Sequence, residues 1–473
     1  MLLQLILLQE RTDMDYSAAN TEMWSLILQL GILALALGAA MLLLRNVSFL
    51  RRAMIPTAVL AGFLLLILRE TGLLALDEAI LEMLVYHTIG LGFIAMSLRR
   101  ALRPKGEDGK RRGRATGLKS GAIIVGTYLV QALTGLAISM GLSPFMPRVF
   151  QASGLLLPMG FGQGPGQANN IGSTYESMGF AGGRSYGLAI AAAGYLCACT
   201  VGVLILRAWS VRRDSGKTPQ TASQQGENCL SMFREPNEIP VSDSNDRFSV
   251  QFVMVLGVYL VTYLFTLGLT SALAAVSPGL AGTLSSLLWG FNFIIGSALA
   301  LLFGRILDKM TEKGVIHWEY RNNYLLSRLS GLFFDLMITA GIASIRIQDI
   351  SGLWLPFLLS VAAGAAVTWF FLKWAARRAY PDYTREGLIS MYGMLTGTIG
   401  SGILLLRQID PELKTPAANN LVIGSSYGIV LGAPLLVFVS LAARSSAMCF
   451  VTFALAAVYL VGLSLLIRRR IRE

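Results

Sequence analysis

The sequence has little charge for its length. Only 14% of its 473 residues are charged, whereas 54% are hydrophobic. This scarcity excludes an ordinary soluble domain, in which about a quarter of the residues carry charge. Apolar runs of about 18 or more residues recur along the chain, and such runs are long enough to cross a bilayer as helices. The composition therefore predicts an all-α polytopic membrane protein.

Residues and motifs that support enzyme chemistry are also scarce. The chain has two histidines and no His-Glu-x-x-His zinc helix,. It lacks a Gly-x-Gly-Asp motif with a second intramembrane aspartate, and it lacks the Gly-x-x-x-x-Gly-Lys-Ser/Thr loop of ATP-driven pumps,. Its four cysteines suggest no disulfide framework,. We expect no enzymatic activity and no cofactor, and for transport this leaves coupling to an ion gradient.

The basic residues indicate an orientation for the chain. The net charge of +12 is concentrated in segments such as 99–119 and 468–472, between or after apolar runs. Placing these segments in the cytoplasm satisfies the positive-inside rule, with the N-terminus outside and the C-terminus inside. The positive-inside rule accounts for the positive charge, so we expect no nucleic-acid partner. We expect the protein to lie in the cytoplasmic membrane, in contact with membrane lipid.

The apolar runs predict eleven spanning helices. Their ranges are 24–44, 53–69, 80–98, 117–140, 185–206, 249–275, 281–304, 329–345, 352–372, 423–442 and 448–467.

Two glycine-rich polar stretches interrupt the apolar pattern, Gly160 to Asn170 and Gly393 to Gly402. Counting either stretch as a full span would place later basic loops outside the cell. We therefore predict re-entrant hairpins at 150–172 and 387–406, the first entering from outside and the second from inside. Non-helical backbone at membrane depth is tolerated where protein or water satisfies it, which is typical of a substrate path.

The predicted order of elements divides the chain into two inverted repeats. Each repeat has five transmembrane helices and one hairpin, and an odd number of spans per repeat inverts the second one. Short matches support this, such as Ser185-Tyr-Gly187 with Ser426-Tyr-Gly428. The predicted parts are an external tail (1–23), a first repeat (24–207), a polar cytoplasmic linker (208–248), a second repeat (249–442), and an additional helix with a basic cytoplasmic tail (443–473).

The hairpins supply the candidate substrate-binding residues. Their glycines allow close approach of the backbone to a ligand, and their amides and hydroxyls are uncharged donors and acceptors. The candidates are Gly162, Gln163, Gly164, Gly166, Gln167, Asn169 and Asn170 in the first hairpin, and Thr396, Gly397, Thr398, Gly400 and Ser401 in the second. Close helix packing is the competing explanation for glycines at such spacing.

Two ionisable residues inside predicted spans are candidates for coupling to a cation. Asp335 lies in the span 329–345, and His87 occupies the equivalent span 80–98 of the other repeat. A carboxylate inside the membrane is costly unless it is paired or binds a cation. A histidine can titrate near neutral pH, although it equally serves as a hydrogen-bonded packing residue. Arg184 and Arg407 follow the hairpins and are candidates either for a substrate carboxylate or for interface anchoring,.

Over residues 24–442 the chain resembles the bacterial sodium/glutamate symporter family. The matching segments are 49–56, 87–91, 160–170, 178–180, 332–345 and 393–397. The resemblance implies sodium-coupled uptake of glutamate by alternating access, and a homodimer. Gln163 stands where the family's first hairpin typically has histidine, and Gly397-Thr-Ile-Gly-Ser401 stands in place of its Thr-Pro-Thr pattern.

These observations predict a secondary transporter that moves glutamate or a related small organic anion together with sodium. One alternative is a proton-coupled carrier of another organic anion, with Asp335 or His87 as the relay. The other alternative is a non-transporting membrane sensor or interaction protein that retains the fold.

Overall fold

The structure is a computed structural model that describes residues 21–53, 55–100, 107–211, 241–276, 285, 288–290, 292–315, 320–410 and 415–469. Most of the predicted external tail and most of the predicted linker lie outside these residues, as do the last four residues of the basic tail. Within the described ranges every regular element is helical, as the composition predicted.

The first half of the chain contains α2 (Thr21–Asn46), α3 (Ser48–Ala53), α4 (Thr57–Glu70), α5 (Glu78–Leu98), α6 (Glu107–Leu142), η1 (Gln151–Leu155), η2 (Pro158–Gly162), α7 (Pro165–Ser177) and α8 (Gly183–Val211). The second half contains α9 (Val241–Val276), α11 (Asn292–Glu312), α12 (Asn323–Ala343), η4 (Ile347–Ile350), α13 (Trp354–Ala379), α14 (Thr384–Thr396), α15 (Ile399–Leu406), α16 (Ala417–Ala442) and α17 (Ser446–Arg468).

Nine of the described helices are long and apolar enough to cross a membrane: α2, α5, α6, α8, α9, α12, α13, α16 and α17. Several of them turn large apolar side chains outward, as Leu35 of α2 and Val458 of α17 do with 75% and 71% of their surface exposed. Apolar surface of this extent is suited to lipid rather than water. By the length and composition of its helices, the protein is therefore a multi-pass membrane protein, as predicted.

The other two predicted spans, 53–69 and 281–304, are not among these nine helices. Helix α4 has 14 residues, which rise only about 21 Å against a hydrocarbon core of about 30 Å. Helix α11 begins at Asn292 and continues into a charged end that contains Asp308 and Lys309. The beginning of the predicted span 281–304 lies outside the described part of the chain.

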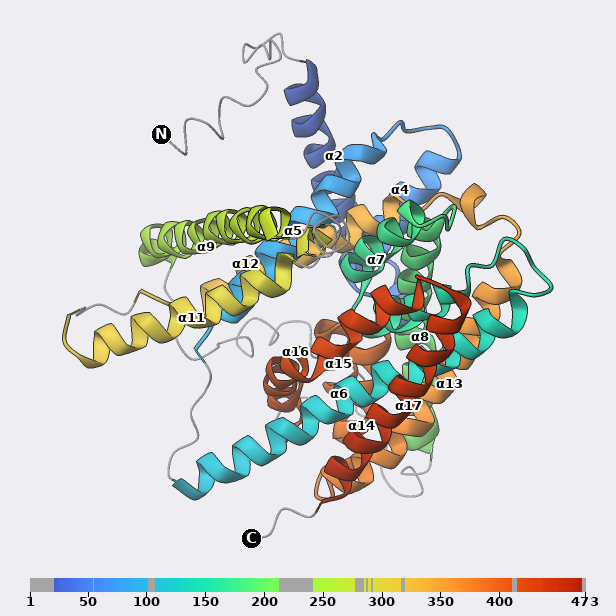
Figure 1. Cartoon of the computed structure of the whole chain (residues 1–473). Coiled ribbons are helices and arrows are strands. Elements are labelled where there is room, and N and C mark those ends of the chain that lie inside the picture. Colours follow the sequence, from blue (N-terminus) through green and yellow to red (C-terminus); the bar gives the residue numbers. More distant parts are fainter. Residues whose placement is uncertain are drawn as a thin grey trace.

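The helices form two groups that each take elements from both halves of the chain (Figure 1). In the first group, α4 packs on α12 and α11 packs on α5, while α5 and α12 pack on each other. Within each half, the first helix packs on the next: α2 packs on α4 in the first half, and α9 packs on α11 in the second. In the second group, α6 packs against α13, α16 and α17.

The segment η1–η2–α7 enters the second group and returns to the same end. On the way in, Gly154 lies against Gly135 of α6, and Gly162 then lies against Tyr128 deeper in that helix. On the way out, α7 runs antiparallel to α8, with Gly172 against Arg184 at the beginning of α8. The segment is therefore a helical hairpin. It begins after the C-terminus of α6 and ends before the N-terminus of α8, at the same end of the bundle.

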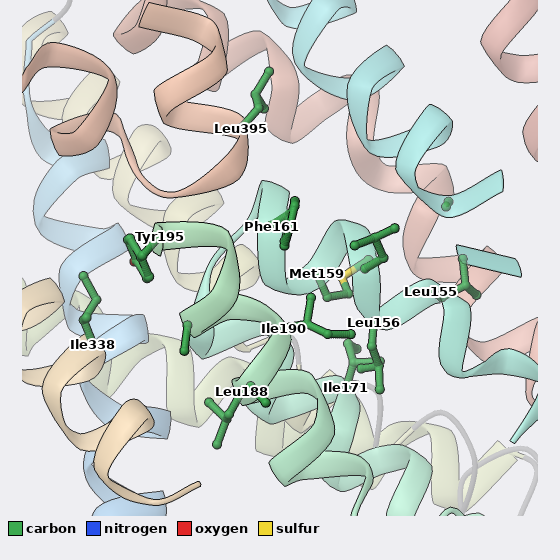
Figure 2. Packing of buried hydrophobic residues seen from close by; sticks show 14 of the residues in the cluster. Leu155, Leu156, Met159, Phe161, Ile171, Leu188, Ile190, Tyr195, Ile338 and Leu395 are labelled. Carbon is green, nitrogen blue, oxygen red and sulfur yellow. The ribbon is translucent and has the colours of Figure 1, made fainter. Parts of the chain in front are cut away.

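Buried apolar side chains hold this first hairpin in place. Figure 2 shows Met159 and Phe161 of η2 near Leu188 and Ile190 of α8, with Ile171 of α7 close by. All five belong to one buried cluster and are at most 1% exposed. Because interiors are close-packed, the hairpin tip has little freedom to shift sideways.

Helices α14 and α15 form the second hairpin, which enters from the opposite end of the bundle. The two helices lie against each other, with Gly393 next to Gly402. Helix α13 is antiparallel to α6, because Gln131 bonds Thr368 and Gly126 meets Phe371. The hairpin that follows α13 therefore begins at the end where α6 begins.

Candidate functional site

The first hairpin turns at Gln163 and Gly164. Gly164 has φ 89° and ψ −176°, a backbone conformation that is essentially restricted to glycine. Pro165 follows as the first residue of α7, where its fixed φ suits a helix start and its missing N–H is not needed. The preceding turn, η2, is π-helical. The local sequence thus ends one helix and starts the next within three residues.

The second hairpin turns at Gly397 and Thr398. Helix α14 ends at Thr396, and α15 begins at Ile399. No side chain caps the N-terminus of α15 or of α7. Both helices therefore begin with backbone N–H groups that have no side-chain acceptor.

The two turns line one cavity of about 310 Å³ between the two groups of helices. The first hairpin contributes Gly162, Gln163 and Gln167, and the second contributes Gly397, Thr398 and Gly400. Helices α5, α11 and α12 close the other side with largely apolar side chains and Asp335. The volume is at the lower end of the range for ligand pockets, about 300–1,000 Å³. It suits a small solute.

Gln167 is the most informative side chain in this cavity. It is 1% exposed, and neither its Nε2 nor its Oε1 has a hydrogen-bond partner. Leaving a buried polar atom unpaired costs about 1–3 kcal/mol. An amide that lines a cavity with both atoms unpaired is prepared to bind a polar group that enters the cavity.

Other unpartnered polar atoms lie close to the turns. The Tyr195 hydroxyl of α8 is buried and lies within reach of the Thr398 side chain, without a well-aligned hydrogen bond. Ser401 Oγ, close to Gly397, is likewise buried and unpartnered. Neither residue belongs to the cavity lining, so both atoms lie beside the turns.

Both hairpins direct a helix N-terminus at the cavity. Gln167 is the third residue of α7, and Gly400 is the second residue of α15. A helix N-terminus carries roughly half a positive elementary charge, and its free N–H groups bind anions. Together with the unpaired amide of Gln167, the two ends form a site suited to a carboxylate.

Asp335 brings the opposite charge to the cavity. It lies on α12 beside Phe334 and lines the cavity wall with it. Asp335 is an exposed residue, and it forms no hydrogen bond or ion pair with the part of the chain that the structure describes. A carboxylate in this position can accept a cation.

The structure brings seven of the predicted site residues to the cavity: Gly162, Gln163, Gln167, Asp335, Gly397, Thr398 and Gly400. Gly164 forms the turn itself. Gly166 packs closely, because an added Cβ would meet the ends of the Ile89 and Met337 side chains.

The remaining hairpin candidates lie behind the cavity. Asn170 donates from Nδ2 to the Gly290 carbonyl at 2.8 Å, and Thr396 donates from Oγ1 to the Tyr392 carbonyl at 2.8 Å. Asn169 is 2% exposed and has an unpartnered Oδ1. Asn170 and Thr396 therefore stabilise the hairpins through these bonds.

His87 is not part of the cavity lining. Its Nδ1 lies 2.7 Å from the Tyr259 hydroxyl of α9. The packing explanation for this histidine fits the geometry better than the relay.

Sequence reasoning missed Tyr195 and three phenylalanines that line the cavity, Phe93, Phe293 and Phe334. Phe93 contacts the other two phenylalanine rings, with centroids 5.2 Å and 5.4 Å away. In a spanning helix, an apolar residue has the same sequence pattern whether it faces lipid, another helix or a cavity. No signal in the chain distinguishes these three from their neighbours.

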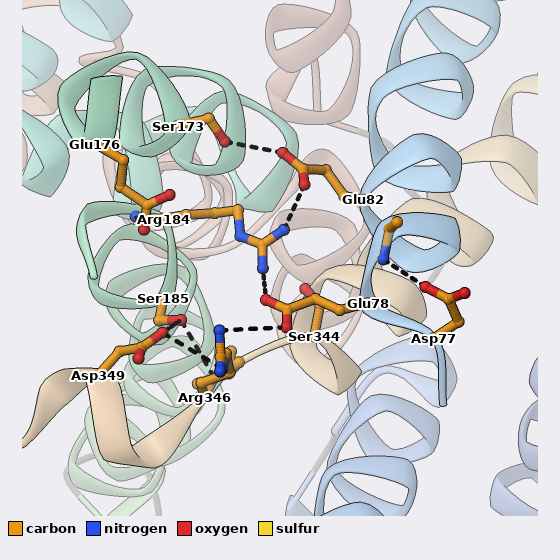
Figure 3. A network of polar contacts seen from close by, with 12 residues as sticks. Asp77, Glu78, Glu82, Ser173, Glu176, Arg184, Ser185, Ser344, Arg346 and Asp349 are labelled. Carbon is orange, nitrogen blue, oxygen red and sulfur yellow. Dashed lines mark hydrogen bonds and ion pairs between the residues drawn. The ribbon is translucent and has the colours of Figure 1, made fainter. Parts of the chain in front are cut away.

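Arg184 lies in an ion-pair network instead of the cavity. Figure 3 shows its guanidinium between Glu78 and Glu82 of α5, and Arg346 and Asp349 extend the network. Arg184 pairs with Glu78 and with Glu82 at 2.7 Å, and Arg346 lies 3.5 Å from Glu78. The network joins the beginnings of α5 and α8 to the segment after α12.

Further polar contacts tie α7 into this network. Ser173 donates from Oγ to Glu82 at 3.1 Å, and the Arg184 backbone N–H donates to Glu176 at 3.1 Å. Partial desolvation raises the pKa of the Glu176 carboxyl, and the bond from the Arg184 N–H opposes this shift.

Replacing Arg184 with alanine is expected to destabilise the protein by roughly 2–4 kcal/mol, because Glu82 loses its counter-charge and Glu78 keeps only Arg346,. The cost is below that of a fully buried pair, since Glu78 and Glu82 keep 32% and 41% of their side chains exposed. Arg346→Ala is the matched control, because the Arg346 side chain is 52% exposed, and we expect about 1 kcal/mol or less. Thermal unfolding in detergent compares the two, and equal losses would contradict this ranking.

No protein-family model and no curated protein matches the chain.

Proposed function

We propose that the protein is a secondary active transporter that carries glutamate or a related small organic anion with sodium across the cytoplasmic membrane by alternating access. The observation that carries the proposal is the buried Gln167 amide, unpaired at both atoms and lining a cavity where two opposed helical hairpins meet. An unpaired amide in a dry core is a defect. In a ligand site it is a binding group.

The arrangement of the helices supports a transport mechanism. The reciprocal packing of α4 on α12 and of α11 on α5 is what two inverted repeats of five helices would produce. The hairpins enter from opposite ends of the bundle, and the cavity lies between two groups of helices. Movement of one group against the other would expose such a cavity first to one end and then to the other.

The charges at the cavity suit the movement of an anion together with a cation. The N-termini of α7 and α15 favour an anion. The backbone carbonyls at the end of α14 and the Asp335 carboxylate favour a cation. A sodium ion as coupling ion would therefore reduce the cost of moving the anion through an apolar interior.

The proposed orientation follows the basic segments, with the N-terminus outside and the C-terminus inside. The exposed apolar faces of α2, α9 and α17 would contact lipid. The homodimer is implied by the resemblance to the sodium/glutamate symporter family.

Uptake by the purified protein in proteoliposomes tests the proposal. We expect labelled glutamate or a related carboxylate to accumulate under an inward sodium gradient. Accumulation only under a proton gradient would replace sodium by proton coupling, with Asp335 as the candidate relay. Absence of flux for amino acids and dicarboxylates under both gradients would contradict transport and favour a sensor.

A further inference from the structure

The cavity lining holds one full charge. Among the described residues that line it, Asp335 is the only acidic side chain, and none is lysine, arginine or histidine. Positive potential comes only from the N-termini of α7 and α15. Two such ends at roughly half a charge each neutralise about one carboxylate.

The charged groups of the protein itself match a cargo with one carboxylate and one ammonium group. Glutamate carries two carboxylates and one ammonium group at neutral pH. The second carboxylate would find its counter-charge only in the coupling sodium ion, whereas an apolar side chain needs none among the apolar residues of the lining,. A cargo with one carboxylate and one ammonium group matches the two helix ends and Asp335.

The apolar wall indicates what else the cargo carries. Phe93, Phe293 and Phe334 come from α5, α11 and α12, and the Phe93 ring contacts the other two rings. Met96 and Ile294 also line the cavity. Pockets of this kind bind apolar groups by removing them from water.

Asp335 is better placed for an ammonium group than for a sodium ion. A sodium ion takes several oxygen ligands, and free carbonyls occur at helix breaks such as Gly397. Asp335 lies within the uninterrupted helix α12, where the backbone carbonyls are used within the helix. An ammonium group needs fewer partners and pairs with one carboxylate.

Resting on the sodium-coupled transport of the proposed function but replacing glutamate as the cargo, we infer that the cargo is a zwitterionic amino acid with an apolar side chain. Its carboxylate binds at the N-termini of α7 and α15 with the Gln167 amide. Its ammonium group pairs with Asp335, and its side chain contacts the three phenylalanines.

Thermal stabilisation of the purified protein by small ligands tests the charge pattern. The probes are L-leucine, L-phenylalanine, 4-methylpentanoate, which lacks the ammonium group, 3-methylbutylamine, which lacks the carboxylate, and glutamate. We expect leucine and phenylalanine to bind, and the other three probes to bind roughly 100-fold more weakly. Tighter binding of glutamate than of leucine would overturn the inference.

The variant Asp335→Asn tests whether Asp335 binds the ammonium group of the cargo or a sodium ion. We expect its affinity for leucine to fall roughly 100-fold, while its affinity for 4-methylpentanoate and its sodium activation curve stay as in the wild type. A sodium curve that shifts equally for both ligands would make Asp335 a sodium ligand and would overturn the assignment of the ammonium group. The wild-type ligand series remains decisive if this variant does not fold.

Uptake in proteoliposomes separates failure of this inference from failure of the proposed function. Glutamate uptake without leucine uptake would overturn the apolar cargo and leave the transporter standing. Leucine binding without flux of any solute would support the ligand class and overturn transport. Absence of both binding and flux for every probe would overturn both proposals.

Discussion

Replacing Gln167 with leucine is expected to raise the thermal stability of the protein while abolishing transport. Gln167 is 1% exposed and leaves both amide atoms without a partner. Leucine has a similar volume and no polar atoms, so the substitution removes a penalty of about 1–3 kcal/mol for each unpaired group. The same change removes a donor from the cavity, which would weaken cargo binding. Unfolding in detergent and uptake in proteoliposomes measure the two effects.

Gln131→Leu is the control, and we expect it to change the stability in the opposite direction. Gln131 is also fully buried and its Oε1 is likewise unpaired, but its Nε2 donates to Thr368 Oγ1 at 2.8 Å and to the Leu395 carbonyl at 3.0 Å. Its loss leaves two buried acceptors without a donor, so we expect a loss of stability of about 1–3 kcal/mol. If Gln167→Leu destabilised the protein as much as Gln131→Leu, Gln167 would be a structural residue and the binding role would be wrong.

Gly164→Ala is expected to abolish transport and to destabilise the protein by roughly 1–3 kcal/mol. At φ 89° and ψ −176°, an alanine is strained whatever the space around it. Space is available, because the nearest atom to an added Cβ is the Tyr195 hydroxyl at 3.8 Å. The strain therefore acts through the backbone, and its relief would turn the start of α7 away from the cavity.

Gly72→Ala separates backbone strain from a role in the site. Gly72 also has a positive φ, 73°, with nothing within 4 Å of an added Cβ. It follows α4 in a turn, and it does not line the cavity. We expect this variant to lose stability and to keep transport per folded molecule at the wild-type level. Equal loss of transport in both variants would show that strain alone, not the position of α7, explains the Gly164 result.

Helix breaks were accessible from the sequence because glycine and proline act locally. Gly164 permits a positive φ and Pro165 fixes its own φ, both without help from distant residues, and the structure has its first turn there,. Gly397 directly follows the last residue of α14. The role of Arg184 was not accessible in this way, because its partners Glu78 and Glu82 lie about a hundred residues away in the chain.

The walls of the cavity depended on packing between distant helices. Phe93, Phe293 and Phe334 lie in apolar stretches whose pattern is the same whether a side chain faces lipid, another helix or a ligand. His87 and Asp335 looked equivalent as ionisable residues inside predicted spans. Packing separates them, since His87 meets Tyr259 of α9 and Asp335 faces the cavity.

The sequence alone determined that the chain is helical, apolar enough for a membrane, and interrupted at two glycine-rich turns, because hydropathy and backbone freedom are properties of consecutive residues. Only the tertiary structure decided that both turns meet in one cavity, that the Gln167 amide is left unpaired there, and that the cavity holds one carboxylate and no cationic side chain among its described residues. These features depend on which faces of distant helices come together. Burial and charge pairing are set by neighbours in space, and the order of residues along the chain does not encode them locally.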